Sequence, residues 1–288
     1  MEFRRRYRLD SSEQNPSRQA FRTVLLSLIS ITLTVYVIVA GFAFFFADRV
    51  LFQPPHPGYT AARLPVTLIP SGQDSIAILH LPNPVARYTI LFSHGNAEDL
   101  GSVSYTLREL HAMGFAVIGF DYRGYGLSTG GPPTSAKATR DAEAVYDYAV
   151  KVLRIPAERL ILYGRSVGSG PTMALASERA AAGVILESPF TSVFRVVTGV
   201  RLLPFDRFPN ITHISRVRAP ILIMQGLQDE VIPVAHGQRL FAAAREPKRA
   251  LWVEGAGHND FAQVAGNRYV AAIQSFAKLL DSTHGAPR

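Results

Sequence analysis

The sequence predicts an α/β protein whose mostly parallel sheet is covered by helices on both faces. Two observations support this prediction: short apolar runs alternate with helix-forming segments beyond residue 88, and a Gly-x-Ser-x-Gly stretch joins one of these runs to the helix after it. Strands that alternate with helices are typical of parallel sheets with two covered faces. A third observation, an uncharged segment near the N-terminus, adds one helix in front of this domain.

The N-terminal part predicts a membrane anchor. Residues 1–22 contain six arginines, and residues 23–47 contain no charged side chain. As a helix, the uncharged segment would be about 37 Å long, enough to cross a hydrocarbon core of about 30 Å. A cleaved signal peptide is the alternative, but its apolar region is shorter and ends at small residues, whereas phenylalanines occupy positions 44–46. The arginines predict a cytoplasmic tail over 1–22 and an extracytoplasmic remainder.

Residues 48–63 are expected to form a proline-rich linker, and residues 64–281 the folded domain. The apolar runs predict eight strands, of which the first two pair antiparallel around a turn. The strands are expected at 64–70, 75–81, 88–93, 116–121, 159–163, 183–187, 220–225 and 250–253. The helices are expected at 103–113, 135–153, 171–180, 235–244 and 261–280.

Residues 188–217 interrupt this alternation. The segment contains several aromatic residues, among them Phe190, Phe194 and Phe205, and few charges. Because it follows a strand at the edge where parallel strands end, it is a candidate for a small cap over the site. A connection with a small core of its own is the alternative.

A serine lies at a sharp turn between an expected strand and the next helix. Ser166 is the centre of Gly164-Arg-Ser-Val-Gly168, between the strand at 159–163 and the helix at 171–180. A serine on such a turn has a strained backbone and an accessible hydroxyl, and the glycines allow strand and helix to approach closely. A glycine-rich turn with an incidental serine is the alternative, because short motifs recur by chance.

A serine hydroxyl becomes a nucleophile when a base takes its proton, and an acid orients that base. In proteins with this type of turn, the acid and then the histidine follow the serine along the chain. Asp229 directly follows the expected strand at 220–225, and His258 lies between the last strand and the last helix. Both side chains are therefore expected at the same sheet edge as Ser166.

Other carboxylates and histidines are weaker candidates. Glu230 adjoins the chosen acid, but adjacent loop residues usually point in different directions, and Glu187 ends another strand at the same edge. His236 lies too near the acid in sequence to face it across the site. His80 and His111 fall in an expected strand and helix.

The negative oxygen of a tetrahedral intermediate requires hydrogen-bond donors. The amide of Val167, directly after the serine, is the first candidate, and the second is expected in the loop after the strand at 88–93. This loop is His-Gly-Asn-Ala over residues 94–97, and its glycine permits a twist that turns the Asn96 amide towards Ser166. A plain turn is the alternative for this loop.

The glycine-rich loop after the strand at 116–121 lies at the same edge. Asp121 and Arg123 are expected to form a buried ion pair there. We interpret this loop as scaffold and not as part of the chemistry.

The composition argues against other functions. The formal net charge is +8, but the sequence contains no basic stripe with interleaved aromatics and no nucleic-acid-binding motif. The absence of cysteine excludes disulfides, thiolate zinc sites and a cysteine nucleophile within these 288 residues. No metal or organic cofactor is implied, and no nucleic-acid partner is expected.

Together the motifs resemble the α/β-hydrolase superfamily, over nearly everything from residue 64 to residue 280. They look most like one branch of it, which contains membrane-associated protein depalmitoylases and single-span serine aminopeptidase-like hydrolases. The segments that carry this likeness are 92–97, 120–126, 164–168, 187–190 and 255–258. The resemblance implies an α/β-hydrolase fold with Ser166 as nucleophile, Asp229 as acid and His258 as base. The depalmitoylases attach through an N-terminal cysteine cluster, and proline-releasing aminopeptidases carry a large cap. Because the sequence shows neither feature, the substrate does not carry over.

These observations predict a membrane-anchored serine hydrolase that cleaves acyl esters or thioesters through an acyl-enzyme. Its expected substrates are acylated small molecules, lipids or lipidated proteins at a membrane, and an apolar groove under the cap would favour long acyl chains. A peptidase or amidase of the serine aminopeptidase-like group is one alternative. A non-catalytic, membrane-anchored binding module with the same fold is another. A dehalogenase or epoxide hydrolase would require an aspartate in place of Ser166.

Overall fold

The computed structural model describes residues 16–283, which divide into two units between Phe46 and Ala47. The N-terminal helix α1 (Pro16–Leu51) begins before the expected segment 23–47 and ends after it. By length and composition it could cross a membrane. Residues 48–51, expected in the linker, are its last helical residues, and the helix ends shortly before two consecutive prolines at 54 and 55. The expected tail lies mostly outside the described residues.

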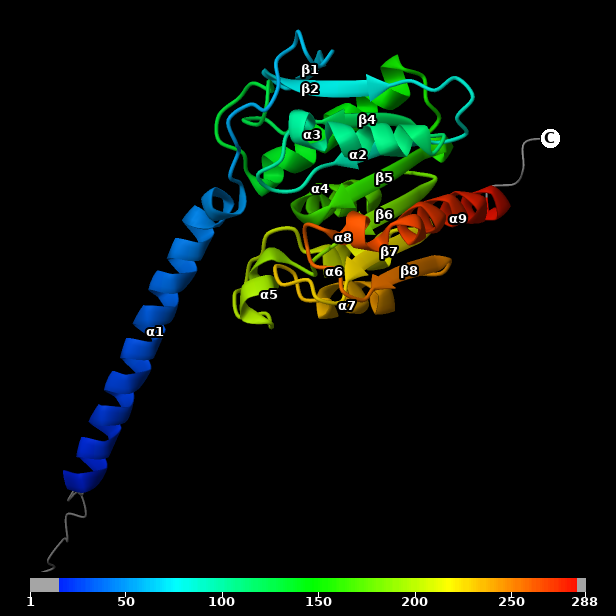
Figure 1. Ribbon diagram of the computed structural model, residues 1–288. Coiled ribbons are helices and arrows are strands. Elements are labelled where there is room, and N and C mark those ends of the chain that lie inside the picture. Colours follow the sequence, from blue (N-terminus) through cyan, green and yellow to red (C-terminus); the bar gives the residue numbers. More distant parts are fainter. Residues whose placement is uncertain (1–15, 284–288) are drawn as a thin grey trace, which may run out of the picture. The chain divides into compact units, whose positions relative to one another are not determined.

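The folded unit contains an eight-stranded sheet with the strand order β1-β2-β4-β3-β5-β6-β7-β8 (Figure 1). β2 pairs antiparallel with β1 and with β4, and all other neighbours are parallel. The predicted fold class, a mostly parallel eight-stranded α/β sheet, is therefore confirmed. The strands are β1 (Thr67–Ser71), β2 (Asp74–Leu81), β3 (Thr89–Ser93), β4 (Ala116–Phe120), β5 (Leu160–Arg165), β6 (Gly183–Glu187), β7 (Ile221–Gly226) and β8 (Lys248–Val253).

Helices cover both faces of the sheet, and each face has its own apolar core (Figure 1). Successive strand residues point to opposite faces, so that Leu162 packs in one core and Tyr163 in the other. One face is covered by α3 (Ser135–Asp147), α4 (Ser169–Ala176), α5 (Val193–Thr198), α6 (Asn210–His213) and α7 (Ala235–Ala243). The other face is covered by α2 (Leu100–Ala112), α8 (Phe261–Ala265) and α9 (Asn267–Thr283).

Two predicted helices differ from the observed ones. The helix expected over 261–280 is interrupted at Gly266, which has a φ of 52° and separates α8 from α9. Glycine adopts this left-handed conformation readily, and the apolar pattern on either side of it conceals the break. The helix expected over 135–153 ends its α-helical part at Asp147 and continues as a π-helix, Tyr148–Val152.

The proline-rich stretch after α1 is packed against the domain and is not a free spacer. The ring of Phe52 is buried, with its centroid 6.3 Å from that of Tyr122, 6.5 Å from that of Tyr125 and 6.2 Å from that of Phe208. Proline prevents regular secondary structure in this stretch, but the packing of the Phe52 side chain holds the start of the stretch against the domain. Residues from Ala47 onward therefore belong to the folded unit.

Candidate active site

The serine turn is built as the Gly-x-Ser-x-Gly pattern predicts. Ser166 lies between β5 and α4 with a φ of 51°, a strained value for a residue with a side chain. A Cβ atom on Gly164 would lie 2.6 Å from the carbonyl oxygen of Gly168, and one on Gly168 would lie 2.1 Å from the carbonyl oxygen of Ser93. Glycine is therefore required at both positions, and the turn holds the serine at the edge where β3 and β5 end.

The structure brings together the three residues predicted as nucleophile, base and acid. His258 Nε2 lies 2.9 Å from Ser166 Oγ, and His258 Nδ1 lies 2.9 Å from Asp229 Oδ2 and 3.0 Å from Asp229 Oδ1. Asp229 follows β7, and His258 lies between β8 and α8. The parallel register of β5 to β8 places these three loops at one edge of the sheet.

Backbone and side-chain donors hold the carboxylate of Asp229. Its Oδ1 accepts hydrogen bonds from the amides of Val231 (3.1 Å) and Ile232 (2.7 Å), and its Oδ2 accepts one from Gln225 Nε2 (3.3 Å). Burial raises the pKa of Asp229, but the hydrogen bonds from His258 and Ile232 lower it more, so that its pKa lies below the usual value. The carboxylate therefore stays ionised beside the imidazole.

The alternative acids and base have other roles in the structure. Glu187 accepts a hydrogen bond from Tyr163 Oη and lies 3.4 Å from Arg165 Nε. Burial raises the pKa of Glu187 above its usual value, more than the nearby Arg165 lowers it. Glu230 is exposed, and His236 Nδ1 lies 2.9 Å from Thr191 Oγ1. Among these candidates, Asp229 is the one placed against His258.

The loop expected to supply the second oxyanion donor lies against Ser166. A Cβ atom on Gly95 would be 3.5 Å from Ser166 Cβ. The Gly95 amide donates to Glu98 Oε2 at 2.6 Å, so it is already engaged within the loop. The side-chain oxygen of Asn96 accepts hydrogen bonds from the Gln53 amide (2.9 Å) and Tyr125 Oη (3.0 Å). These contacts hold the side chain of Asn96 in place.

Sequence reasoning missed the side chains that join this loop to the serine turn. Arg165, the residue before Ser166, donates from its NH1 to Glu98 Oε1 at 2.7 Å. Glu98 thereby contacts the Gly95 amide with one oxygen and the arginine with the other. Both residues lie directly beside predicted motif positions, but nothing in their spacing indicates that they pair across the sheet edge.

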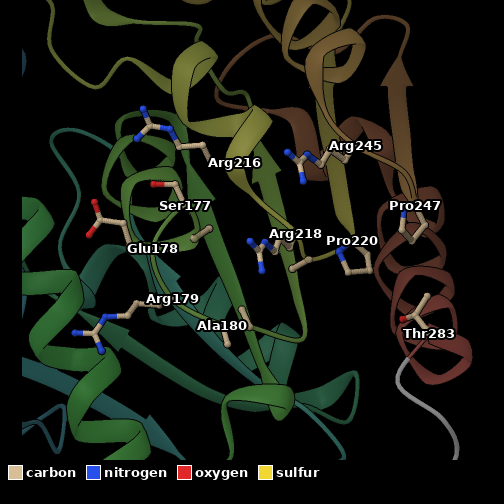
Figure 2. Close-up of a pocket in the computed structure, with 13 residues that line it drawn as sticks. Ser177, Glu178, Arg179, Ala180, Arg216, Arg218, Pro220, Arg245, Pro247 and Thr283 are labelled. Atoms are coloured by element: carbon tan, nitrogen blue, oxygen red, sulfur yellow. The ribbon is translucent and has the colours of Figure 1, made fainter.

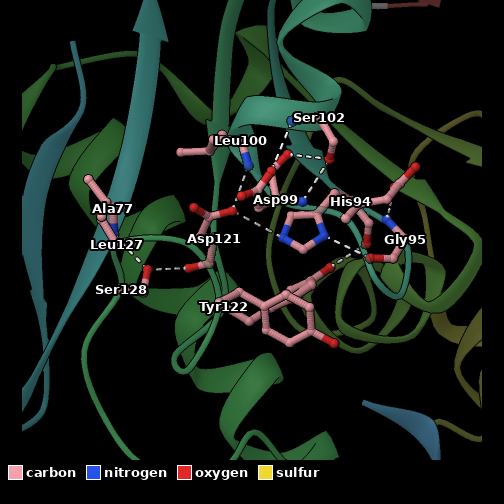
Figure 3. A network of polar contacts seen from close by, with 12 residues as sticks. Ala77, His94, Gly95, Asp99, Leu100, Ser102, Asp121, Tyr122, Leu127 and Ser128 are labelled. Atoms are coloured by element: carbon pink, nitrogen blue, oxygen red, sulfur yellow. Dashed lines mark hydrogen bonds and ion pairs between the residues drawn. The ribbon is translucent and has the colours of Figure 1, made fainter. Parts of the chain in front are cut away.

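His94, at the start of the same loop, lies in a buried polar network (Figure 3). His94 Nδ1 is 2.8 Å from the Gly95 carbonyl oxygen, and His94 Nε2 is 3.5 Å from Asp121 Oδ1, a separation too long for a good hydrogen bond but close for opposite charges. Burial lowers the pKa of His94, but the nearby negative charge of Asp121 and the carbonyl oxygen of Gly95 raise it more, so that the net shift is upward.

The predicted ion pair between Asp121 and Arg123 is wrong. Asp121 accepts hydrogen bonds from the Leu100 amide (2.8 Å) and Tyr59 Oη (2.5 Å), beside His94. The guanidinium of Arg123 binds Asp141 on α3, with its Nε 3.0 Å from Oδ1. The two side chains leave the loop in different directions, and each finds its partner in a distant part of the sequence.

The segment 188–217 contains α5, α6 and a 3-10 turn, Ile214–Arg216. Phe190, expected to line an acyl groove, is buried instead, with its ring centroid 6.4 Å from that of Phe208. The rings of Phe194 and Phe205 are partly exposed and pack edge to face, 5.8 Å apart. Of the three aromatic residues expected at the groove, Phe194 and Phe205 are therefore accessible to a ligand.

The described residues also line cavities, of which one lies far from Ser166 and another beside it. One cavity of about 810 Å³ lies at the amino ends of β6 and β7, the edge opposite to Ser166, and arginines 216, 218 and 245 line it (Figure 2). Another of about 600 Å³ lies beside the predicted site and is lined by Arg165, Glu187 and Asn259, among others. Within residues 16–283, no group of three or more His, Cys, Asp and Glu side chains could hold a metal ion.

Comparisons with known proteins identify the family. The family model described as serine aminopeptidase, S33, matches residues 84–205. Alpha/beta hydrolase domain-containing protein 17B from Homo sapiens is 44% identical over 181 residues, which is 62% of each chain. Alpha/beta hydrolase domain-containing protein 17C from Xenopus tropicalis is 40% identical over 197 residues, 67% of this chain and 63% of the relative. The chain belongs to the α/β-hydrolase superfamily, in its serine aminopeptidase-like branch.

Solved α/β-hydrolase structures share the fold at low sequence identity. An esterase from Pyrococcus furiosus superposes with a TM-score of 0.67 at 18% identity, over 79% of this chain and 97% of the esterase. An esterase from Rhodococcus superposes with a TM-score of 0.59, also at 18% identity, over 75% of this chain and 99% of the other. At these identities the likeness is one of fold alone. The chain spans about 62% of the length of the human relative.

Proposed function

We propose that this α/β-hydrolase is a membrane-anchored serine hydrolase that cleaves acyl esters or thioesters. The observation that carries the proposal is the continuous series of contacts from Ser166 Oγ through both nitrogens of His258 to Asp229, each link 2.9 Å long. A hydroxyl, an imidazole and an ionised carboxylate in this order form the arrangement that activates a serine nucleophile. The strained backbone of Ser166 places the hydroxyl at the end of this series.

In this mechanism His258 takes the proton of Ser166 as the hydroxyl oxygen attacks the acyl carbonyl carbon. The amides of Val167 and Asn96 are the proposed donors to the negative oxygen of the tetrahedral intermediate. Its collapse breaks the bond to the leaving alcohol or thiol, which receives the proton from His258. A water molecule then loses a proton to His258 and attacks the acyl-enzyme, the bond between the acyl carbon and Ser166 Oγ breaks, and Ser166 takes the proton from His258 as the acid leaves. Asp229 stabilises the imidazolium in both stages.

A lipid-linked acyl group is the proposed substrate, on an acylated small molecule, a lipid or a lipidated protein. The length and composition of α1 support attachment to a membrane, and the upstream arginines support an extracytoplasmic domain. The motif resemblance to membrane-associated depalmitoylases supports an acyl thioester or ester. The partly exposed pair Phe194 and Phe205 could contact an acyl chain.

Labelling with a fluorophosphonate probe tests the nucleophile. The probe should label the wild type and the control Ser215→Ala, whose serine is exposed and away from the predicted site residues in sequence. It should not label Ser166→Ala, provided that the variant remains folded by circular dichroism. Labelling of Ser166→Ala at the wild-type rate would refute the assignment, and a folded wild type without any labelling would favour the binding-module alternative.

The matching serine aminopeptidase model favours amide hydrolysis as a second candidate function. The two reactions share the acyl-enzyme but differ in leaving group, so paired substrates distinguish them. We expect kcat/KM for p-nitrophenyl esters and acyl thioesters to exceed that for aminoacyl p-nitroanilides at least tenfold. The reverse preference would establish a peptidase.

A further inference from the structure

The end of α5 and the loop that follows it expose a group of apolar side chains. The exposed fraction is 86% for Val197, 59% for Val200 and 59% for Leu202. These residues lie within positions 197–202, hereafter the α5 tip. Single exposed apolar residues are common on protein surfaces, but a group of them marks an interaction surface.

The α5 tip is an ordered turn. Gly199 ends α5 with a φ of 72°, and Thr198 Oγ1 lies within hydrogen-bond distance of the carbonyl oxygens of Phe194 (2.9 Å) and Val200 (2.6 Å), to either of which it can donate its proton. The guanidinium of Arg201 donates to the Pro204 carbonyl oxygen at 3.1 Å. The polar groups of the turn are therefore bound locally, while its apolar side chains remain exposed.

Two arginines lie beside these apolar side chains. Arg201 lies within the tip, and Arg239 of α7 reaches it, with NH1 3.4 Å from the Gly199 carbonyl oxygen; both arginines are exposed. The nearest carboxylate in sequence, Asp206, accepts hydrogen bonds from the amides of Phe194 and Arg207. Apolar side chains with adjacent arginines suit the interface of a bilayer that contains anionic lipids.

Contacts within the folded unit connect the tip with the place where the chain would leave the membrane. Asp48 is the first charged residue after the uncharged segment, and its Oδ2 lies 3.3 Å from Arg207 Nε. The Arg207 carbonyl oxygen accepts a hydrogen bond from the amide of Val193, the first residue of α5, at 3.0 Å. The tip begins at Val197, four residues after Val193 and therefore about 6 Å further along the helix, a distance comparable with the thickness of a headgroup layer.

We propose that the α5 tip inserts into the bilayer that contains α1 and thereby turns the active-site edge towards the membrane. The segment 188–217 follows β6 at the same edge as Ser166. An acyl chain could then pass from the bilayer to the serine along the partly exposed side of this segment. The insertion is inferred from the exposed apolar side chains and arginines of the tip alone, whereas a role of the tip in substrate entry rests on the proposed function.

Depth-dependent fluorescence quenching tests the insertion. Because the sequence has no cysteine, Val200→Cys gives one labelling site for an environment-sensitive fluorophore in the full chain. The matched control is Val85→Cys, since Val85 is 92% exposed and lies between β2 and β3 at the opposite edge. In vesicles of phosphatidylcholine and phosphatidylglycerol, nitroxide lipids should quench the label at 200 at least threefold more than the label at 85.

Equal quenching at the two positions would overturn the proposal. Excimer emission from pyrene at 200 without lipid quenching would also overturn it, because a second copy of the chain would then cover the tip. An activity assay tests the consequence: Val197→Asp with Val200→Asp should lower hydrolysis of a vesicle-embedded long-chain ester at least fivefold and leave hydrolysis of soluble p-nitrophenyl acetate unchanged.

An equal loss on both substrates, or no loss on either, would contradict a role of the tip in substrate entry. If the wild type hydrolysed neither substrate, the proposed function would fail, and the contrast in quenching between positions 200 and 85 would still decide whether the tip inserts.

Discussion

Arg165 and Glu98 form a 2.7 Å ion pair that joins the two backbone segments on either side of the Ser166 hydroxyl. Arg165 ends β5 directly before the serine, and Glu98 belongs to the loop after β3. Because the other oxygen of Glu98 accepts the Gly95 amide at 2.6 Å, the pair fixes the loop that would present the Asn96 amide. Both side chains are largely buried, so solvent screens this pair less than a surface pair.

Removal of Glu98 should therefore impair turnover more than substrate binding. Loss of a whole oxyanion donor costs about 10²–10³ in kcat, and a donor that is only misplaced should cost less. We expect Glu98→Ala to lower kcat about tenfold with little change in KM, and Glu98→Asp to restore part of the loss. Glu158→Ala, at an exposed position before β5, is the control. An unchanged kcat in Glu98→Ala would show that the loop needs no such support.

Asp229→Asn should reduce kcat by several orders of magnitude. The change removes the charge that stabilises the imidazolium of His258, and the analogous change in a serine protease costs about 10⁴. Glu187→Gln should have a much smaller effect, because Glu187 binds Tyr163 and Arg165. Steady-state kinetics with a short-chain p-nitrophenyl ester compares the two. A silent Asp229→Asn together with an inactive Glu187→Gln would reverse the assignment of the acid.

His94 should make folding stability depend on pH. A histidine whose pKa is raised in the folded state stabilises that state fully below the unfolded pKa of about 6.5, and this contribution is lost as pH rises through the folded pKa. The wild type should therefore lose more stability than His94→Gln from about pH 6 to about pH 9. Thermal unfolding of the full chain in detergent, followed by the fluorescence of the single tryptophan, Trp252, measures this difference.

His56→Gln, at an exposed position, controls for the loss of a histidine as such. If wild type and His94→Gln showed parallel pH profiles, the contact between His94 and Asp121 would contribute nothing to the pH dependence.

The uncharged segment 23–47 and its arginine flank predict the topology. In a bacterial host, alkaline phosphatase fused after Arg288 should be active, because this enzyme needs export from the cytoplasm. An inactive phosphatase fusion, together with a fluorescent green reporter at the same C-terminal position, would reverse the orientation. Detection of a mature N-terminus near Asp48 would instead identify the segment as a cleaved signal peptide.

Acyl-chain selectivity should depend on the aromatic pair Phe194 and Phe205. Each methylene buried on binding contributes about 0.8 kcal/mol, or roughly fourfold in kcat/KM. We expect kcat/KM to rise from acetyl to at least octanoyl p-nitrophenyl esters. Phe205→Asp should flatten this rise without abolishing acetyl ester hydrolysis, whereas the control Val85→Asp should leave it intact. An optimum at acetyl in the wild type would exclude a groove for long chains.

Much of the fold was predictable because its signals are local. Each buried strand is a short apolar run next to glycine or a polar turn, and the motif around Ser166 defines a turn with a known strand and helix on either side. The positions of Asp229 and His258 were predictable because parallel strands bring successive loops to one edge. The break at Gly266 was not predictable, since the helical pattern continues on both sides of it.

Long-range polar pairing was also beyond sequence reasoning. Arg123 pairs with Asp141 instead of Asp121, and Arg165 with Glu98. Which residues pair depends on which side chains meet across the sheet edge. Neither the spacing nor the periodicity of the sequence indicates which side chains meet. Likewise, the prolines after Leu51 indicated an irregular segment correctly, but they gave no sign that Phe52 would be buried.

The contact between Gln53 and Asn96 has a consequence for any protein released from the membrane. A protease that cut within residues 54–58 would free the hydrolase domain but would leave Phe52 and Gln53 with the anchor. The shed domain would lack both the amide that holds the Asn96 side chain and the ring packed against Tyr125. If the chain is a membrane-anchored hydrolase as proposed, we expect shedding to abolish its activity, which would then be confined to the membrane surface.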